Sequence, residues 1–149
     1  MRIIALLVAV AALAAVPAAL ADGTYQTQKF AFTPVVEGVG GGGFVVNIHA
    51  NGPNVFAHEQ YVVKGLQPLT SYEVTLHVSL DAACASPVAE AVTATITTNP
   101  AGNGTAFHVF TPDDIGGAGL HGMTIHPLWT LSTDGEVVYT TGCQTAPLD

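Results

Sequence analysis

Six histidines are the residues of this sequence that could do the most chemistry. Neutral imidazoles are common ligands of copper and zinc, and histidines on neighbouring strands can converge on one ion. The alternation of apolar and polar residues predicts that three of them face outward. Two interpretations are open: a copper or zinc site, or partly exposed polar residues on strands. The outward-facing residues are His49, His58 and His77, the candidate ligands are these three with His121 and His126, and the wider set includes His108.

The chain has two cysteines, Cys84 and Cys143, whose thiolates could act as a metal ligand or a nucleophile. No C-x-x-C motif is present, and no histidine lies near Cys143 in the sequence. An even pair of cysteines in an exported chain most simply forms one disulfide. We therefore predict a bridge that closes a loop of 59 residues (143 − 84) and fastens the last strand to the body of the domain.

Catalytic signatures are missing from the sequence. It contains no G-x-S-x-G, no P-loop and no H-E-x-x-H motif. Asp113 and Asp114 follow Thr111-Pro112 and suggest either a calcium-binding turn or a solvated cap, of which the cap is the commoner arrangement. Trp129 is expected in the core. The sequence favours a protein without catalytic activity.

The elements that must position these residues read as short strands. Valine and threonine are abundant, and both favour a pleated, half-buried surface. Turn signals such as Asn99-Pro100 and Asp134-Gly135 separate the apolar runs. Strands at regular spacing without helices between them predict an all-β, antiparallel two-sheet sandwich. The eight expected strands cover residues 24–32, 44–50, 55–64, 72–80, 91–98, 105–110, 123–131 and 136–141.

The segment Leu66-Gln67-Pro68-Leu69-Thr70-Ser71-Tyr72 carries a resemblance to a known architecture. It resembles the tyrosine corner of fibronectin type III and other immunoglobulin-like domains. There Leu66 and Tyr72 would be buried, Pro68 would set the turn, and the tyrosine hydroxyl would bond back to the crossover backbone. About four strands follow Tyr72, where a fibronectin type III domain has about two. The resemblance implies an immunoglobulin-like sandwich of unassigned topology.

Two families of metalloprotein have ligand patterns that bear on the histidines. The segment from Gly119 to His126 is similar to a copper-ligand segment of copper–zinc superoxide dismutases, but Thr124 stands where that family has a ligand histidine. Of the two ligand positions in the segment, only His126 matches. A cupredoxin site needs Cys, His and Met together near the C-terminus, and neither His nor Met follows Cys143. Neither family is therefore expected.

The N-terminus predicts where the protein is located, and the charge balance disfavours some partners. Residues 1–21 have a positive start, an apolar run and an Ala-x-Ala motif before Asp22, as in a secretory signal peptide. The remaining residues 22–149 form one expected domain, with a flexible glycine-rich loop at 38–43. The chain has 3 Lys and Arg, 11 Asp and Glu and a net charge of −8, which disfavours nucleic acid and anionic membrane surfaces.

Together these features predict a secreted, extracellular or periplasmic domain with no membrane span after signal cleavage. We expect it to be a binding, adhesion or cell-envelope module without a cofactor, whose partner is an unidentified extracellular protein or carbohydrate. The alternative is a redox or scavenging protein that binds copper or zinc through its histidines. Asn103-Gly104-Thr105 fits a glycosylation sequon, which matters only in a eukaryotic host.

Overall fold

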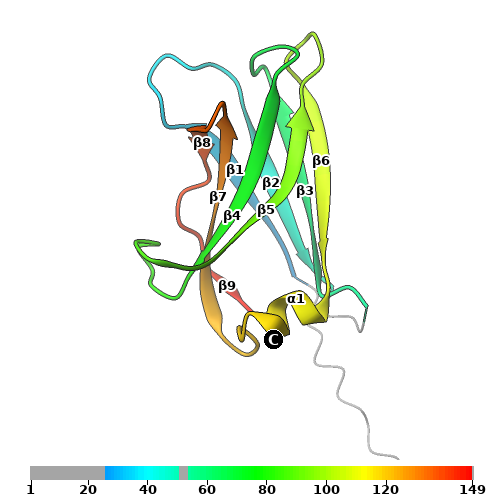
Figure 1. The fold of residues 1–149 in the computed structure, drawn as a ribbon, viewed down its shortest axis with the longest axis vertical. Helices are drawn as coiled ribbons and strands as arrows, with labels where there is room; N and C mark the ends of the chain where they lie inside the picture. Colours follow the sequence, from blue (N-terminus) through cyan, green and yellow to red (C-terminus); the bar gives the residue numbers. More distant parts are fainter. Residues whose placement is uncertain (1–25, 51–53, 149) are drawn as a thin grey trace, which may run out of the picture.

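A computed structural model describes residues 26–50 and 54–148 of the chain. The expected signal peptide at 1–21 and residues 22–25 of the expected domain lie outside these described residues. The described part is built from antiparallel strands with one short helix (Figure 1). The eight expected strands are confirmed, with bounds that differ by a few residues. The elements are β1 (Gln26–Pro34), β2 (Gly42–His49), β3 (Ala57–Lys64), β4 (Ser71–Ser79), β5 (Pro87–Thr97), β6 (Gly104–Phe110), α1 (Pro112–Gly117), β7 (Thr124–Thr133), β8 (Glu136–Thr140) and β9 (Ala146–Pro147).

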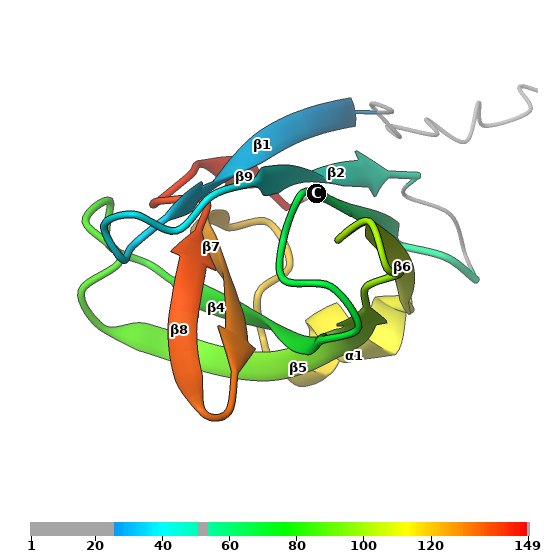
Figure 2. The same cartoon turned by 90° about the horizontal axis from the view of Figure 1, so that it is seen from above.

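The strands form one continuous sheet rather than two separate layers. Their order is β5-β4-β7-β8-β1-β2-β3-β6, and the two-residue β9 pairs with β7. The first part of β1 pairs with β2, while Thr33 and Pro34 at its end pair with β8. Strand β1 therefore joins the two halves, and the sheet curls into a nearly closed barrel (Figure 2). The expected two-sheet sandwich is corrected accordingly, because the ladders run through β1 without a break.

The barrel has one seam, between β5 and β6. These strands stand at the two ends of the order, and no ladder joins them in the described part of the chain. They are close at Gly104, where an added Cβ would lie 2.6 Å from Cγ2 of Ile96. Toward the other end they diverge, and α1 lies below them (Figure 1). We call this the α1 end of the barrel, where His49, Ala57 and Phe110 are paired across β2, β3 and β6.

The glycine-rich loop is shorter than expected, because part of it belongs to a strand. Gly42 and Gly43 belong to β2, so only 38–41 of the expected loop 38–43 connects strands. A Cβ at Gly43 would lie 2.2 Å from the carbonyl oxygen of Val62. Glycine is required there because β2 and β3 approach closely, which is a packing role within a strand rather than a flexible one.

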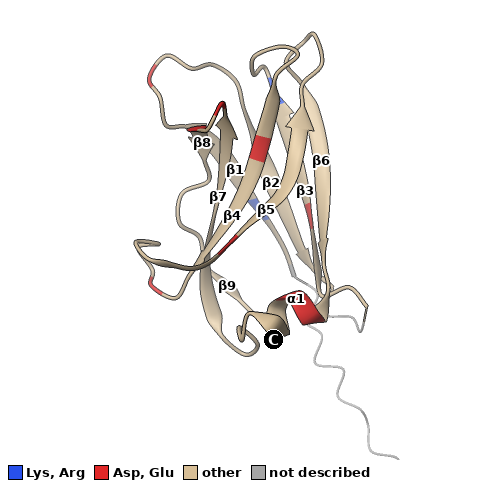
Figure 3. Cartoon of the chain, viewed as in Figure 1, with Lys and Arg blue, Asp and Glu red and all other residues tan. Residues whose placement is uncertain are grey.

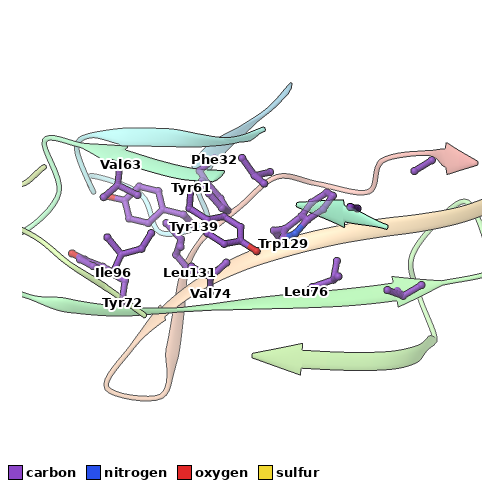
Figure 4. Close-up of a cluster of buried hydrophobic side chains, with 14 of the residues drawn as sticks. Phe32, Tyr61, Val63, Tyr72, Val74, Leu76, Ile96, Trp129, Leu131 and Tyr139 are labelled. Atoms are coloured by element: carbon purple, nitrogen blue, oxygen red, sulfur yellow. The ribbon is translucent and has the colours of Figure 1, made fainter. Parts of the chain in front are cut away.

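The core fills the barrel with side chains from opposite walls. Tyr61, Trp129 and Tyr139 are its largest fully buried members (Figure 4). Trp129 stacks on Phe30, with 5.4 Å between ring centroids. The expectation that Trp129 belongs to the core is confirmed.

The predicted disulfide is present between Cys84 and Cys143, whose Cα atoms are 5.7 Å apart. It ties the loop before β5 to the segment after β8, which are 59 residues apart in the chain. The C-terminal segment then runs along β7, where the amide of Leu148 donates to the carbonyl of Met123. The bridge therefore holds the chain end against the α1 end of the barrel.

The segment between β3 and β4 contains the hydrogen bond expected of a tyrosine corner. Leu66 and Tyr72 are buried, and the Tyr72 hydroxyl accepts a hydrogen bond of 3.2 Å from the Gln67 amide. The hydroxyl is the acceptor of this bond. Thr98 adds to the corner, since its hydroxyl donates to the Gln67 carbonyl at 2.6 Å. The chain thus crosses from β3 to β4 over one end of the barrel with its backbone groups bonded.

The corner gives a first prediction. Tyr72→Phe leaves the Gln67 amide without its acceptor and should lower the free energy of unfolding by about 1 kcal/mol. Urea denaturation of the two proteins measures the difference. An unchanged midpoint for Tyr72→Phe would contradict a role of the hydroxyl.

Candidate functional site

A buried carboxylate lies inside the barrel. Alternate residues of β3 face the interior, and these are Ala57, Glu59, Tyr61 and Val63. Glu59 is only 1% exposed although it is ionisable. Carboxylates are almost never fully buried unless they are paired, so Glu59 marks a candidate site. In the sequence, the site could have been found from a glutamate among the inward-facing residues of β3, followed two positions later by a tyrosine.

Three donors hold the Glu59 carboxylate. Oε2 accepts hydrogen bonds from the Tyr61 hydroxyl and from Nε1 of Trp129, the latter at 2.9 Å. Oε1 accepts one from Nδ2 of Asn47, at 3.2 Å, and Asn47 is the direct cross-strand partner of Glu59. The Tyr61 hydroxyl also lies 2.7 Å from Oγ1 of Thr93 on β5. The network thus joins β2, β3, β5 and β7 across the interior.

A β-bulge on β5 supplies the threonine. Val74 of β4 pairs with Ala94 and Thr75 pairs with Val92, so Thr93 is the extra residue. Bulges re-aim side chains, and here Thr93 turns inward to 6% exposure while Val92 is 57% exposed. Regular alternation along this strand would turn Val92 inward, on the same face as Ile96, and the threonines outward. The bulge reverses that pattern at these two positions.

Burial sets the protonation chemistry of the site. Removal from water raises the pKa of Glu59 to about 7, and the hydrogen bonds from Tyr61 and Trp129 counter only part of this effect. Burial, the nearby Glu59 carboxylate and its hydrogen bond also raise the pKa of Tyr61. No lysine or arginine of the described residues bonds to Glu59: Lys29 lies over the Phe44 ring and Lys64 is exposed. The carboxylate is therefore held by neutral donors alone.

A small cavity of about 40 Å³ adjoins the carboxylate at the α1 end of the barrel. Its polar lining is Glu59, Asn47 and His49, and the rest is apolar or aromatic. Oδ1 of Asn47 is buried there and has no hydrogen-bond partner among the described residues. An unpaired buried acceptor costs about 1 to 3 kcal/mol, which a ligand donor could recover. The other lining residues are Phe56, Ala57, Leu76, Val78, Phe110, Ile115, Leu120, Ile125, Pro127, Trp129 and Leu148.

An outer pocket of about 340 Å³ adjoins this cavity and shares part of its lining. Its lining residues come from β4, β5, β6 and the α1 region, and we call this pocket the wedge. Figure 1 shows α1 below the diverging ends of β5 and β6. Only side chains separate the two spaces, because both are lined by the same five apolar residues. Glu90, His108 and Asp114 lie at the outer pocket. The five shared residues are Leu76, Val78, Phe110, Ile115 and Leu120.

Helix α1, which forms the lower wall of the outer pocket, was not expected from the sequence. Thr111 and Asp114 make a reciprocal capping box, and Pro112 occupies the first turn. The Asp114 carboxylate accepts from the Thr111 amide at 2.7 Å, and this bond is the main reason that the pKa of Asp114 is lowered. Asp114 is therefore a cap, the commoner of the two arrangements considered above. In the sequence, Thr111-Pro112-Asp113-Asp114 was the pattern from which the helix start could have been predicted.

The histidines do not share one face of the barrel. His49 is buried inside and corrects our expectation that it faces outward, because β2 turns Asn47 and His49 inward and leaves Ile48 outside. His49 and His121 both pack edge-on against Phe56, each with ring centroids 5.7 Å from it. Of the candidate ligands, these two are the pair that packs against one shared residue, Phe56.

The remaining histidines have separate partners. His77 lies 2.9 Å from Oε1 of Glu90 and 3.1 Å from Oγ1 of Thr130. Nδ1 of His126 lies 3.0 Å from the Gln144 carbonyl oxygen. His58 lies on the outer side of β3, and His108 packs edge-on against Phe110. Across residues 26–50 and 54–148, no group of three histidine, cysteine or acidic side chains is placed to hold a metal ion.

A larger groove of about 610 Å³ lies outside the barrel along β6. None of its lining side chains is buried, and Phe107 in its wall is 76% exposed. The interior cavity with its wedge is the better candidate, because ligand sites combine an apolar wall with a few convergent polar groups.

Comparison with protein-family models, with curated proteins and with solved structures finds no match for this chain. In the described residues, no helix has the length and apolar character needed to cross a membrane.

Proposed function

We propose that this protein is a non-catalytic binding protein for a small amphiphilic molecule. The apolar body of the ligand occupies the wedge between β5, β6 and α1, and its polar head reaches Asn47 and Glu59. One observation carries this proposal: an apolar pocket adjoins a cavity where Oδ1 of Asn47 is buried, without a partner among the described residues, beside a buried carboxylate.

The dimensions support a small ligand. The outer pocket, at about 340 Å³, lies at the lower end of the range for small-molecule sites. The inner cavity of about 40 Å³ has room for a polar head only. The head reaches it when Phe110, Ile115 or Leu120 changes rotamer, since these side chains line both spaces.

We also propose that the protein acts outside the cytoplasm. The Cys84–Cys143 disulfide supports this location, because such bonds persist in oxidising compartments. The signal-like start of the sequence points the same way. The immunoglobulin-like relationship remains a prediction. The tyrosine corner supports it, whereas the nearly closed barrel gives it no support.

The test uses N-phenyl-1-naphthylamine, a neutral apolar dye that becomes fluorescent when it leaves water. We expect one dye per chain to bind to the wild-type protein. Ala118→Trp places an indole in the wall of the outer pocket and should weaken binding at least tenfold. Val137→Trp adds the same group on the exposed face of β8 and should leave binding unchanged. Equal binding by the Ala118→Trp variant, or none by the wild type, would contradict the proposal.

A further inference from the structure

Building on the proposed function, we infer that the polar head of the ligand is a protonated amine, so that the site selects amphiphilic monoamines over alcohols and carboxylic acids. The inference depends on three features: the partners of Glu59, the acceptors at the end of the cavity, and the charges at the mouth.

The first feature is a buried carboxylate held by neutral groups. Tyr61, Trp129 and Asn47 donate to Glu59, and none of them carries a positive charge. Buried charges are normally paired with an opposite charge, because unpaired ones are costly to remove from water. Apart from histidines, the described residues contain two side chains that can carry a positive charge, Lys29 and Lys64, and neither lines the cavity or the wedge. An ammonium group would supply the missing charge.

The second feature is the number of acceptors. An ammonium group carries three donor hydrogens and no acceptor, whereas an alcohol has a single donor hydrogen. At the cavity, Oδ1 of Asn47 has no partner among the described residues, and Oε1 of Glu59 accepts a hydrogen bond from Nδ2 of Asn47. The rings of Trp129 and Phe56 also line this space, and aromatic faces attract cations. The end of the cavity therefore fits a group that only donates.

The third feature is the charge at the mouth. Glu90 on β5 and Asp114 on α1 both line the outer pocket, and no lysine does. Figure 3 shows acidic positions on β5 and α1, and few basic positions in the described part of the chain. The net charge of the sequence is −8. This field attracts cations to the mouth and repels carboxylates, because complementary potentials steer charged ligands.

Binding of an amine is coupled to the protonation of Glu59. Burial raises the pKa of this carboxyl to about 7, so at pH 6 the empty site is mostly neutral. An ammonium beside it favours the carboxylate, and the proton passes from Glu59 to the buffer. The other titratable groups are Tyr61 in the network, His49 on β2 at the cavity, and Glu90, His108 and Asp114 at the outer pocket.

The experiment measures displacement of N-phenyl-1-naphthylamine by octylamine, octanol and octanoate, which share one apolar chain. For the wild-type protein we expect octylamine to displace the dye at a concentration at least tenfold below that of octanol. Octanoate should be the weakest. The apparent affinity for octylamine should rise about tenfold between pH 6 and pH 8, as Glu59 changes from mostly protonated to mostly ionised. Octanol should show no such rise.

Two variants separate the charge from the shape of the site. Glu59→Gln keeps the size of the side chain, so the dye should still bind, while the advantage of octylamine and its pH dependence should disappear. Glu73→Gln removes a charge from the exposed face of β4 and should keep both. If the pH dependence persists in Glu59→Gln, it belongs to a group such as His49 and the inference is overturned.

Calorimetry of the wild-type protein tests the same inference without a variant. Octylamine binding at pH 6, measured in buffers with different ionisation enthalpies, should release close to one proton per chain. Release of no proton, or octanol competing as well as octylamine while the dye binds, would overturn the amine inference and leave the proposed function standing. Failure of the dye to bind would remove the proposed function itself.

Discussion

Between pH 5 and pH 8, Glu59 should lower the free energy of unfolding by about 2 to 3 kcal/mol as the pH rises. The pKa of Glu59 is about 7 in the folded protein, against 4.5 for an unperturbed glutamate. The folded state therefore holds a proton that the unfolded state releases. Its stabilising effect is complete below pH 4.5 and is lost as the pH passes through 7. This direction is opposite to that of most carboxylates in folded proteins.

Urea denaturation of the wild-type and Glu59→Gln proteins at several pH values measures this effect. Histidine titration affects both proteins alike, so the difference between them reports Glu59. Relative to the wild type, Glu59→Gln should gain about 2 to 3 kcal/mol between pH 5 and pH 8. The Glu73→Gln control should stay parallel to the wild type. A constant difference between wild type and Glu59→Gln would show that Glu59 has an ordinary pKa.

Loss of the disulfide should have the largest effect on stability. The bridge between Cys84 and Cys143 closes a loop of 59 residues, and the chain-entropy model gives it about 4 kcal/mol. The double variant Cys84→Ser, Cys143→Ser should therefore unfold at a much lower urea concentration than the wild type. The C-terminal segment that runs along β7 should become accessible to protease first, because the bridge fastens it.

Reduction of the wild-type protein with dithiothreitol is the matched control for this variant. It breaks the same bond without changing side-chain volume, so it should give a similar loss. A loss in the double variant but not after complete reduction would assign the effect to the serines. An unchanged midpoint in both would mean that the bridge does not constrain the unfolded chain.

The strands could be predicted because their residues follow simple local rules. In β4 the alternation from Tyr72 to Val78 puts apolar side chains in the core, and the structure agrees. The closure of the barrel could not be predicted, since it depends on β1 pairing with β2 along most of its length and with β8 at its end. Local periodicity contains no information about which strands become neighbours.

The candidate site was missed for a different reason. Glu59, Asn47 and Thr93 are polar residues on inward positions, so hydrophobic alternation places them outside. The apolar run Phe44-Val45-Val46 in β2 also leaves both faces of that strand plausible as the core face. His49 was assigned to the wrong side for this reason. The inward position of Thr93 could not be predicted without the bulge, and the bulge is defined by how β4 pairs with β5.

The seam between β5 and β6 should control the rate at which the proposed ligand enters and leaves. No ladder joins these strands in the described part of the chain, so entry through the wedge breaks no backbone hydrogen bond. On the proposed entry route, side chains such as Ile115 and Leu120 must rotate, whereas the sheet does not need to open. Rotamer changes of this kind occur far faster than local unfolding. Ligand residence time should therefore be independent of the stability of the barrel, and destabilising variants distant from the wedge should bind and release at wild-type rates.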